Sequence, residues 1–292
     1  MALTFDIVLS GLVLGGMYAL IAMGLTLQYG IARIMNLSYG ESLIASAFAA
    51  MFLYTGMAVN PILGLLVIVP LSFAGNWLLY QIVLMPLVKR AKNQGMLEVD
   101  SILGTFGVLF VLQGLMLVSF GGSLQSYSYL SVPVHVLTTT LAANRILALA
   151  FALAIGGGIY LLLTRTRFGT ALRAIAVNPV AAQLSGIDIR AASALAFAGG
   201  GAIAAAGGVL ISMFLTFSAA SGVVFTMKAL IVVIMGGVGN MLGALVAGLL
   251  LGVSETAVAR LVDPGLTIAV TYALFLSVLL WRPTGLFGRP AR

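Results

Sequence analysis

Long, nearly uncharged apolar runs follow one another along almost the whole chain. A helix needs about 20 mostly apolar residues to cross the hydrocarbon core of a bilayer, and several of the runs reach that length. Charged residues make up only 7% of the chain, against about 25% in soluble domains, so a soluble globular fold is excluded. The sequence predicts an all-α polytopic membrane protein with about eight or nine transmembrane helices. The runs are 7–29, 42–59, 62–85, 101–120, 145–163, 191–215, 223–239, 241–260 and 265–281.

Ten of the fourteen cationic side chains fall in three polar segments. These are Lys89, Arg90 and Lys92, then Arg165, Arg167, Arg173 and Arg190, and finally Arg282, Arg289 and Arg292. Cytoplasmic loops are enriched in Lys and Arg, and the number of runs between the segments allows all three to lie on one side. We therefore expect a cytoplasmic C-terminus and an N-terminus outside. The net charge of +7 reports this topology, so no nucleic-acid partner is expected.

The polar segment 165–190 contains the signals of a short helix. Asn178 can accept a hydrogen bond as an N-cap, Pro179 suits the first helical position, and Gly186 can end the helix after 180–185. The result would be a two-turn helix about 10 Å long. Two readings are open: an ordinary basic loop that obeys the charge rule, or a helix that receives force from a cytoplasmic partner.

Glycine and alanine concentrate in the second half of the chain. In 236–252, Gly239 and Gly243 have GxxxG spacing, and so do Gly248 and Gly252. Small residues let helices approach closely in a membrane, so we expect close packing inside the bundle or against a second subunit. The crowded glycines also predict a broken or re-entrant segment over 228–252, which makes the runs 223–239 and 241–260 the least certain spans.

A polar interruption, NLSYGE, separates the first two apolar runs. Ser38 and Glu41 have the S-x-x-E spacing of a capping box, which would start the second helix. Alternatively, Asn36, Tyr39 and Glu41 lie at a broken helix and face a substrate pathway, because ionisable residues inside a membrane are usually functional. Both readings can hold together.

Two further charged residues lie within or beside apolar runs. Glu255 has Arg260 five residues later, a spacing that allows only a weak intrahelical pair. Lys228 can either extend to the membrane interface or hold a substrate carboxylate.

No pattern for catalysis or cofactor binding occurs in the sequence. There is no G-x-x-x-x-G-K-[ST], and none of the three lysines follows a glycine, so the chain cannot form a Walker A site for ATP. Cysteine is absent, and no cluster of histidine and carboxylates suggests a metal site. The single histidine, His135, lies in the uncharged segment 121–144, which we expect to be an external loop with His135 on its surface. We therefore predict no enzyme activity, no cofactor and no metal.

Four ordered blocks of sequence resemble the LivH and LivM family of permease subunits from ATP-binding-cassette (ABC) importers of branched-chain amino acids. They are YALIAMGLTLQYGIARIMNLSYGE (18–41), GTALRAIAVNPVAAQLSGI (169–187), MKALIVVIMGGVGNMLGALVAGLLLGVSE (227–255) and RPTGLFGRP (282–290). The chain is more similar to the LivH branch, because it is short and ends in PTGLFGRP. The resemblance covers nearly the whole chain and implies one permease domain, 1–292, in a bacterial inner membrane.

The resemblance also implies partners and an energy source. These are a homologous LivM-type permease, two cytoplasmic ATPase subunits that hydrolyse ATP, and a periplasmic binding protein that delivers the substrate. In this reading 164–190 is the coupling loop. Substrates within the family include branched-chain and other hydrophobic amino acids, while urea, amides, aromatic acids and sugars are alternatives. A secondary carrier or channel acting alone, and a scaffold without transport, are the readings from other classes.

Roles for individual residues follow from the resemblance as well. Arg173 and Asn178 would orient the coupling helix, which begins at Pro179 and ends at Gly186, while Ala181, Ala182 and Leu184 would pack into a groove on the ATPase. The translocation path would be lined or shaped by Asn36, Tyr39, Gly40, Glu41, Gly236, Gly237, Gly239 and Gly243. Many relatives carry histidine at the position of Tyr39, and this departure affects the predicted substrate rather than the fold.

Overall fold

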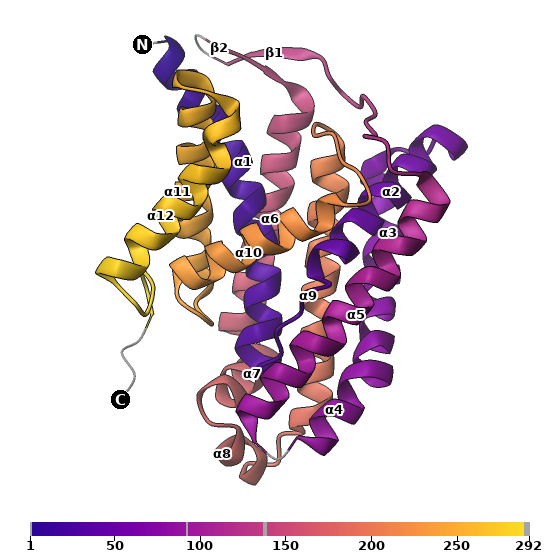
Figure 1. Ribbon diagram of the computed structural model, residues 1–292, viewed down its shortest axis with the longest axis vertical. Coiled ribbons are helices and arrows are strands. Elements are labelled where there is room, and N and C mark those ends of the chain that lie inside the picture. The colour runs from indigo at the N-terminus through magenta and orange to yellow at the C-terminus, as the bar shows by residue number, and fades with distance from the viewer. Residues whose placement is uncertain (1, 92, 137–138, 289–292) are drawn as a thin grey trace.

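The computed structural model describes residues 2–91, 93–136 and 139–288 (Figure 1). Upright helices form most of the bundle, and a small antiparallel hairpin lies at one end. In chain order the elements are α1 (Ala2–Leu27), the π-helix η1 (Gln28–Ala32), α2 (Tyr39–Met57), α3 (Pro61–Leu79), the π-helix η2 (Tyr80–Leu84), α4 (Met85–Arg90), α5 (Gln94–Phe120), β1 (Pro133–Val136), β2 (Thr139–Ala142), α6 (Ala143–Arg165), α7 (Arg167–Val177), α8 (Pro179–Leu184), α9 (Ile189–Ser212), α10 (Ser221–Gly236), α11 (Met241–Leu261), the 3-10 helix η3 (Pro264–Leu266) and α12 (Thr267–Trp281).

The predicted all-α membrane fold is confirmed. Each apolar run coincides with a helix, and within the described residues seven helices are long and apolar enough to cross a membrane. The segment α10 falls short with 16 residues and runs obliquely across the upright helices (Figure 1), so the doubt over 223–239 was justified. The run 241–260 forms the full-length helix α11. The helix α2 is not among the seven, because its first turn, YGES, is polar.

Asparagine caps start four of the helices. Asn60, Asn93, Asn178 and Asn240 each accept a hydrogen bond from a backbone N–H in the first turn of α3, α5, α8 and α11, at N···O distances of 2.8–3.1 Å. Such a bond satisfies one of the N–H groups that the helix itself leaves unpaired. Local sequence therefore fixes where these helices begin.

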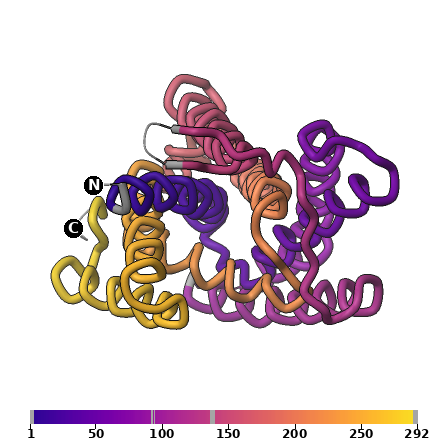
Figure 2. Tube along the Cα trace, turned by 90° about the horizontal axis from the view of Figure 1, so that it is seen from above, coloured from indigo at the N-terminus to yellow at the C-terminus, as the bar shows by residue number. Residues whose placement is uncertain are grey.

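The helices α1 and α9 form the centre of the bundle. Their most apolar windows are 78% and 83% buried by the rest of the chain, whereas the corresponding window of α12 is 6% buried. In the view from above, α1 lies alongside α11 (Figure 2). A side chain at Gly248 or Gly252 of α11 would overlap the backbone of α1 at Ala19 or Gly15. The GxxxG pair Gly248 and Gly252 therefore packs inside the bundle.

The two ends of the bundle carry different features. The helices α4, α7 and α8 lie at one end, and the start of α1 lies at the opposite end with the β1–β2 hairpin (Figure 1). Two of the three cationic segments, at α4 and α7, thus share the end opposite to the start of α1, while the side of the membrane and the placement of the C-terminus stay predictions. The hairpin pairs His135 with Thr140, and His135 is exposed as expected.

Candidate translocation site and coupling surface

The helical structure is interrupted between α1 and α2, near the centre of the bundle. After the π-helix η1, Arg33 takes a left-handed conformation with φ 52°, and residues 33–36 are irregular. The polar side chains of Gln28 and Asn36 are buried beside this break and bond to one another. The Asn36 amide donates to Gln28 Oε1 at 3.1 Å, and the Gln28 amide donates to the Phe197 carbonyl of α9 at 2.7 Å. The break is therefore held in one arrangement.

Asn36 also organises the start of α2, which corrects the predicted capping box. The Ser38 backbone N–H donates to Asn36 Oδ1 at 3.0 Å, and the Ser38 hydroxyl donates to the same atom at 2.7 Å. Ser38 therefore makes no side-chain cap, and the Glu41 carboxylate does not reach back to it. The capping box is wrong because an asparagine two residues earlier occupies the N–H that Glu41 was expected to bind.

The first residues of α2 are packed against two neighbouring helices, α1 and α10. The Tyr39 hydroxyl donates to the Ile21 carbonyl of α1 at 2.6 Å, and the Gly40 N–H donates to Thr226 Oγ1 of α10 at 2.8 Å. Glu41 is fully buried, and neither of its carboxylate oxygens has a hydrogen-bond partner among the described residues. Tyr39, Gly40 and Glu41 therefore lie together beside α10, and the contact between α2 and α10 leaves them buried.

The predicted glycine-rich break lies between α10 and α11. Gly237 and Gly239 have φ values of 99° and 79°, which ordinary side chains disfavour. A side chain at Gly236 or Gly243 would overlap the other residue's backbone, so this pair closes the hairpin between the helices. The break is therefore a tight turn between a short helix and a full-length one.

The C-terminal tail packs onto this same turn. The Leu286 N–H donates to the Met235 carbonyl at 2.7 Å, and the Phe287 N–H donates to the Gly236 carbonyl at 3.1 Å. The Asn240 amide donates to the Phe287 carbonyl at 3.0 Å. Two of the sequence blocks thus meet in space: the described part of the last one, 282–288, contacts 227–255 through hydrogen bonds to backbone groups.

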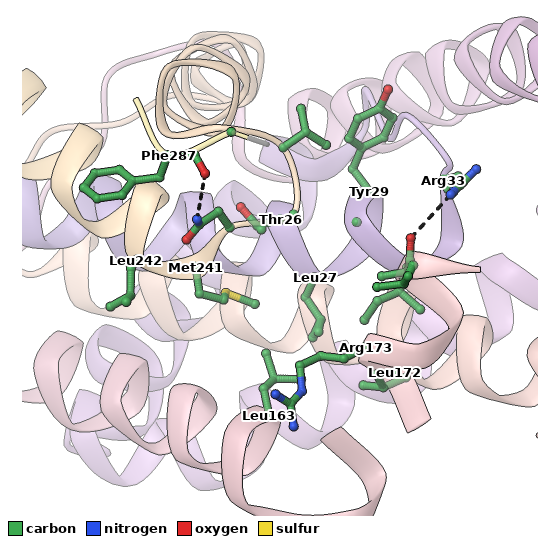
Figure 3. A pocket seen from close by; sticks show the side chains of 18 of the residues that line it. Thr26, Leu27, Tyr29, Arg33, Leu163, Leu172, Arg173, Met241, Leu242 and Phe287 are labelled. Atoms are coloured by element: carbon green, nitrogen blue, oxygen red, sulfur yellow. Dashed lines mark hydrogen bonds between the residues drawn. The ribbon is translucent and has the colours of Figure 1, made fainter. Parts of the chain in front are cut away.

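A cavity of about 840 Å³ lies beside the turn, at the end of the bundle that holds α7 (Figure 3). The end of α1, the helices α6 and α7, the α10–α11 turn and the tail all contribute to its wall. Its polar side chains include Tyr29, Arg33 and Arg173, and Arg33 donates to the Ala176 carbonyl at 3.4 Å. Among the residues predicted for the translocation path, Gly239 lines this cavity. The predicted residues at the start of α2 do not line it; these are Asn36, Tyr39, Gly40 and Glu41.

The predicted coupling helix is present as α8, with Asn178 as its cap, Pro179 at its first position and Gly186 at φ 81° after its end. Ala181 and Leu184 are exposed, as a docking surface requires. Ala182 is buried within this chain, so the expectation that it packs into a groove on another subunit is wrong. Arg173, on α7, donates to the Thr164 carbonyl at the end of α6 at 3.4 Å. The structure thus places a short, largely exposed helix at this end of the bundle, with Ala182 as its buried residue.

A buried polar network connects four helices that the sequence did not link. Lys228 Nζ of α10 lies 2.8 Å from Glu255 Oε2 of α11, and the Tyr18 hydroxyl of α1 donates to the same oxygen at 2.8 Å. The Thr271 hydroxyl of α12 donates to Glu255 Oε1 at 2.5 Å. Arg260, the partner considered for Glu255, instead lies 3.4 Å from Asp6. Only the presence of two opposite charges in apolar runs could have indicated the Lys228–Glu255 pair.

Comparison with known proteins identifies the family. The family model described as "Branched-chain amino acid transport system / permease component" matches residues 7–279. The chain is 28% identical to the permease protein BraD of Pseudomonas aeruginosa and to the permease protein LivH of Salmonella typhimurium, in each case over 96% of this chain and 94% of the relative. It is 26% identical to a probable LivH of Methanocaldococcus jannaschii, over 95% of this chain and 90% of the relative.

No solved structure matches the chain significantly. The Pseudomonas and Salmonella relatives are named as permease proteins of high-affinity branched-chain amino acid transport systems, and no enzyme family is indicated. Because the family model covers residues 7–279 of a polytopic helical bundle, this chain belongs to the family of permease components of branched-chain amino acid transport systems.

Proposed function

We propose that this chain is one permease subunit of an ABC importer in a bacterial inner membrane. It pairs with a homologous LivM-type permease, and a periplasmic binding protein delivers branched-chain or other hydrophobic amino acids to the pair. Two cytoplasmic ATPase subunits supply the energy. The names of the relatives, permease proteins of branched-chain amino acid transport systems, support this role. In this importer α7 and α8 lie on the cytoplasmic side, and the N-terminus lies outside.

The observation that carries the proposal is the geometry of α8. A helix of six residues is too short to be stable by itself, yet α8 is capped at its start by Asn178 and anchored inward by Ala182. Val180 and Leu184 are 67% and 86% exposed, which leaves an apolar surface on a polar end of the bundle. Such a surface is suited to a groove on a soluble partner, and Arg165, Arg167 and Arg173 are exposed near it.

The energy must come from another subunit, because the chain has no Walker A motif. Closure of the ATPases would push on α8, and the Arg173–Thr164 contact would transmit the movement from α7 to α6. The cavity beside α7 would release the substrate toward the cytoplasm. A ligand shifts such an equilibrium only by binding the states differently, so the permease can bind its substrate weakly.

Leu184→Asp tests the docking surface. The side chain is 86% exposed, so the isolated permease should fold normally, but a charge in the groove should reduce ATPase co-purification about tenfold or more. Leu124→Asp is the matched control, because Leu124 is 73% exposed and precedes the hairpin at the opposite end. Deleting 178–186 should abolish assembly or coupling. Normal ATPase recovery and normal substrate-stimulated ATP hydrolysis in Leu184→Asp and in the deletion would overturn the assignment.

Uptake assays separate the proposal from its rivals. Liposomes with the two permeases and two ATPases should take up L-leucine only with ATP and the loaded binding protein. Urea, an aromatic acid and ribose, each with its own binding protein, test the other substrates of the family. Uptake by the purified chain alone, driven by a gradient, would instead show a secondary carrier.

A further inference from the structure

Within the part of the chain that the structure describes, the carboxylate of Glu41 makes no hydrogen bond that would explain a charged side chain at this buried position. Its side chain is fully buried at the start of α2, and both carboxylate oxygens lack a hydrogen-bond partner among the described residues. A buried polar group without a partner destabilises a protein, and an ionisable one inside a membrane is more costly still. A residue kept for packing alone would be apolar at this position.

Glu41 does not cap the helix α2, because another residue binds the N–H that it would cap. A capping box would have used the carboxylate to bind the Ser38 N–H, but that N–H donates to Asn36 Oδ1 at 3.0 Å. The Gly40 N–H next to it donates to Thr226 Oγ1 at 2.8 Å. Removing the Glu41 carboxylate would therefore leave the hydrogen bonds of Ser38, Tyr39 and Gly40 at the start of α2 intact.

The surroundings are nevertheless shaped to hold the carboxylate. A side chain at Gly222, in the first turn of α10, would overlap both carboxylate oxygens of Glu41. A side chain at Gly40 would likewise overlap the Gly222 carbonyl. Gly222 thus leaves a recess that the carboxylate fills, and Gly40 lets the start of α2 approach the beginning of α10 closely. Broken helices of this kind form the ligand sites of many transporters.

A carboxylate in such a recess needs a cation or a proton as its partner. The cation on the facing helix, Lys228, is bound to Glu255 at 2.8 Å and has the Tyr18 hydroxyl 2.6 Å away. A transported amino acid carries an ammonium group, which donates up to three hydrogen bonds to carboxylates as a lysine does. We propose that the Glu41 carboxylate binds the ammonium group of the amino acid during translocation. This inference rests on the proposed function and names the group that the pathway recognises.

The recess is closed in this structure, so binding requires α2 and α10 to separate at this contact. The contact to be opened includes the hydrogen bonds of Thr226 with Gly40 and Leu37 and the close approach of Gly40 to Gly222. The oblique, short α10 leads into the glycine turn, on which the tail packs, and this turn faces α7 across the cavity. A movement of α7 that reaches this turn can therefore open the recess.

The test is ATP-driven uptake of L-leucine by liposomes that hold the full complex with its binding protein. Glu41→Gln keeps the shape of the side chain and removes the charge, so uptake should fall about tenfold or more. Glu41→Asp retains a carboxylate and should stay within about threefold of the wild type. Gel filtration and co-purification of the ATPases show whether each variant still assembles.

The outcomes distinguish this inference from the proposed function. Absence of ATP-dependent uptake by the wild-type complex would contradict the proposed function. Wild-type uptake together with normal uptake by an assembled Glu41→Gln complex would overturn the ammonium site alone. A pH-sensitive dye inside the liposomes completes the test, because one proton moved with each leucine would make Glu41 a proton site and also overturn the inference. Loss of uptake in Glu41→Gln, recovery in Glu41→Asp and no proton movement support it.

Discussion

Two buried glutamates lie in contrasting surroundings. Glu255 has three side-chain partners, Tyr18, Lys228 and Thr271, on three different helices. Glu41 is as deeply buried but has no partner for either oxygen among the described residues. The same side chain thus serves two purposes: one glutamate holds helices together, and the other leaves its hydrogen-bonding capacity for something that the fold does not supply.

The difference also separates two parts of the bundle. The Glu255 network joins α1, α10, α11 and α12, where close glycine contacts already hold α1 against α11. At the Glu41 recess α2 meets α10 through Gly40, Gly222 and Thr226. We infer that the first region is a fixed frame and that the second is a contact that opens. Perturbing each region should therefore affect different measurements.

Lys228→Met should have the largest effect on stability. It leaves the Glu255 carboxylate buried without its cation, and breaking one partner of a buried pair typically lowers the free energy of unfolding by about 3–5 kcal/mol. Equilibrium unfolding in mixed micelles measures the change. The double variant Lys228→Met with Glu255→Met should recover most of the loss, because it removes both charges. A double variant as unstable as the single one would argue against the pair as the cause.

Thr271→Val should have the next largest effect. It removes the hydroxyl that donates to Glu255 Oε1, and a hydrogen bond to a charged group contributes about 1.5–3 kcal/mol. Ser277→Ala is the control on the same helix, since its hydroxyl donates only to the Ala273 carbonyl one turn away. The same unfolding assay measures both variants. Equal losses of stability would show that the hydrogen bond to Glu255 stabilises the protein no more than a hydrogen bond within the helix.

Gly222→Ala should give a smaller change whose sign depends on residue 41. The added methyl would overlap the Glu41 carboxylate, and such overpacking costs about 1–3 kcal/mol, partly offset by the better helix propensity of alanine. In a Glu41→Ala background the recess is empty, so the same substitution should be neutral or stabilising. A double-mutant cycle measures this coupling, and a cycle with no coupling would mean that the two residues do not touch.

Asp6→Asn should have the smallest effect. Asp6 and Arg260 lie 3.4 Å apart, and the arginine side chain is half exposed, so the pair should contribute less than about 1 kcal/mol. Repeating the unfolding measurement at high salt should remove even that contribution. A loss comparable with that of Lys228→Met would show that exposure does not distinguish the two ion pairs.

The sequence predicted the features that depend on near neighbours. The apolar runs predicted the helices, and Asn178, Pro179 and Gly186 predicted the boundaries of α8, because caps and turns act within a few residues. The capping box failed although it is also local, since Asn36 competed successfully for the Ser38 N–H.

Contacts between distant segments could not be predicted in this way. Tyr18 lies 237 residues from Glu255, and no local pattern connects them. Docking of the tail on the α10–α11 turn uses backbone groups that every residue has, so the side chains gave no signal for it. For Glu41 the sequence indicated an unusual residue, and only the structure revealed that its carboxylate has no role in capping.

Glu41→Leu and Glu255→Leu, compared in one preparation, test most directly the claim that the first glutamate serves transport and the second serves the fold. The two measured quantities are the apparent melting temperature and ATP-driven leucine uptake. For Glu41→Leu we predict a melting temperature at or above that of the wild type, because a buried unpaired carboxyl is removed, together with about a tenfold or greater loss of uptake. For Glu255→Leu we predict a clearly lower melting temperature, because Lys228 loses its partner. A Glu41→Leu protein that melts as early as Glu255→Leu, or that transports leucine like the wild type, would contradict the claim.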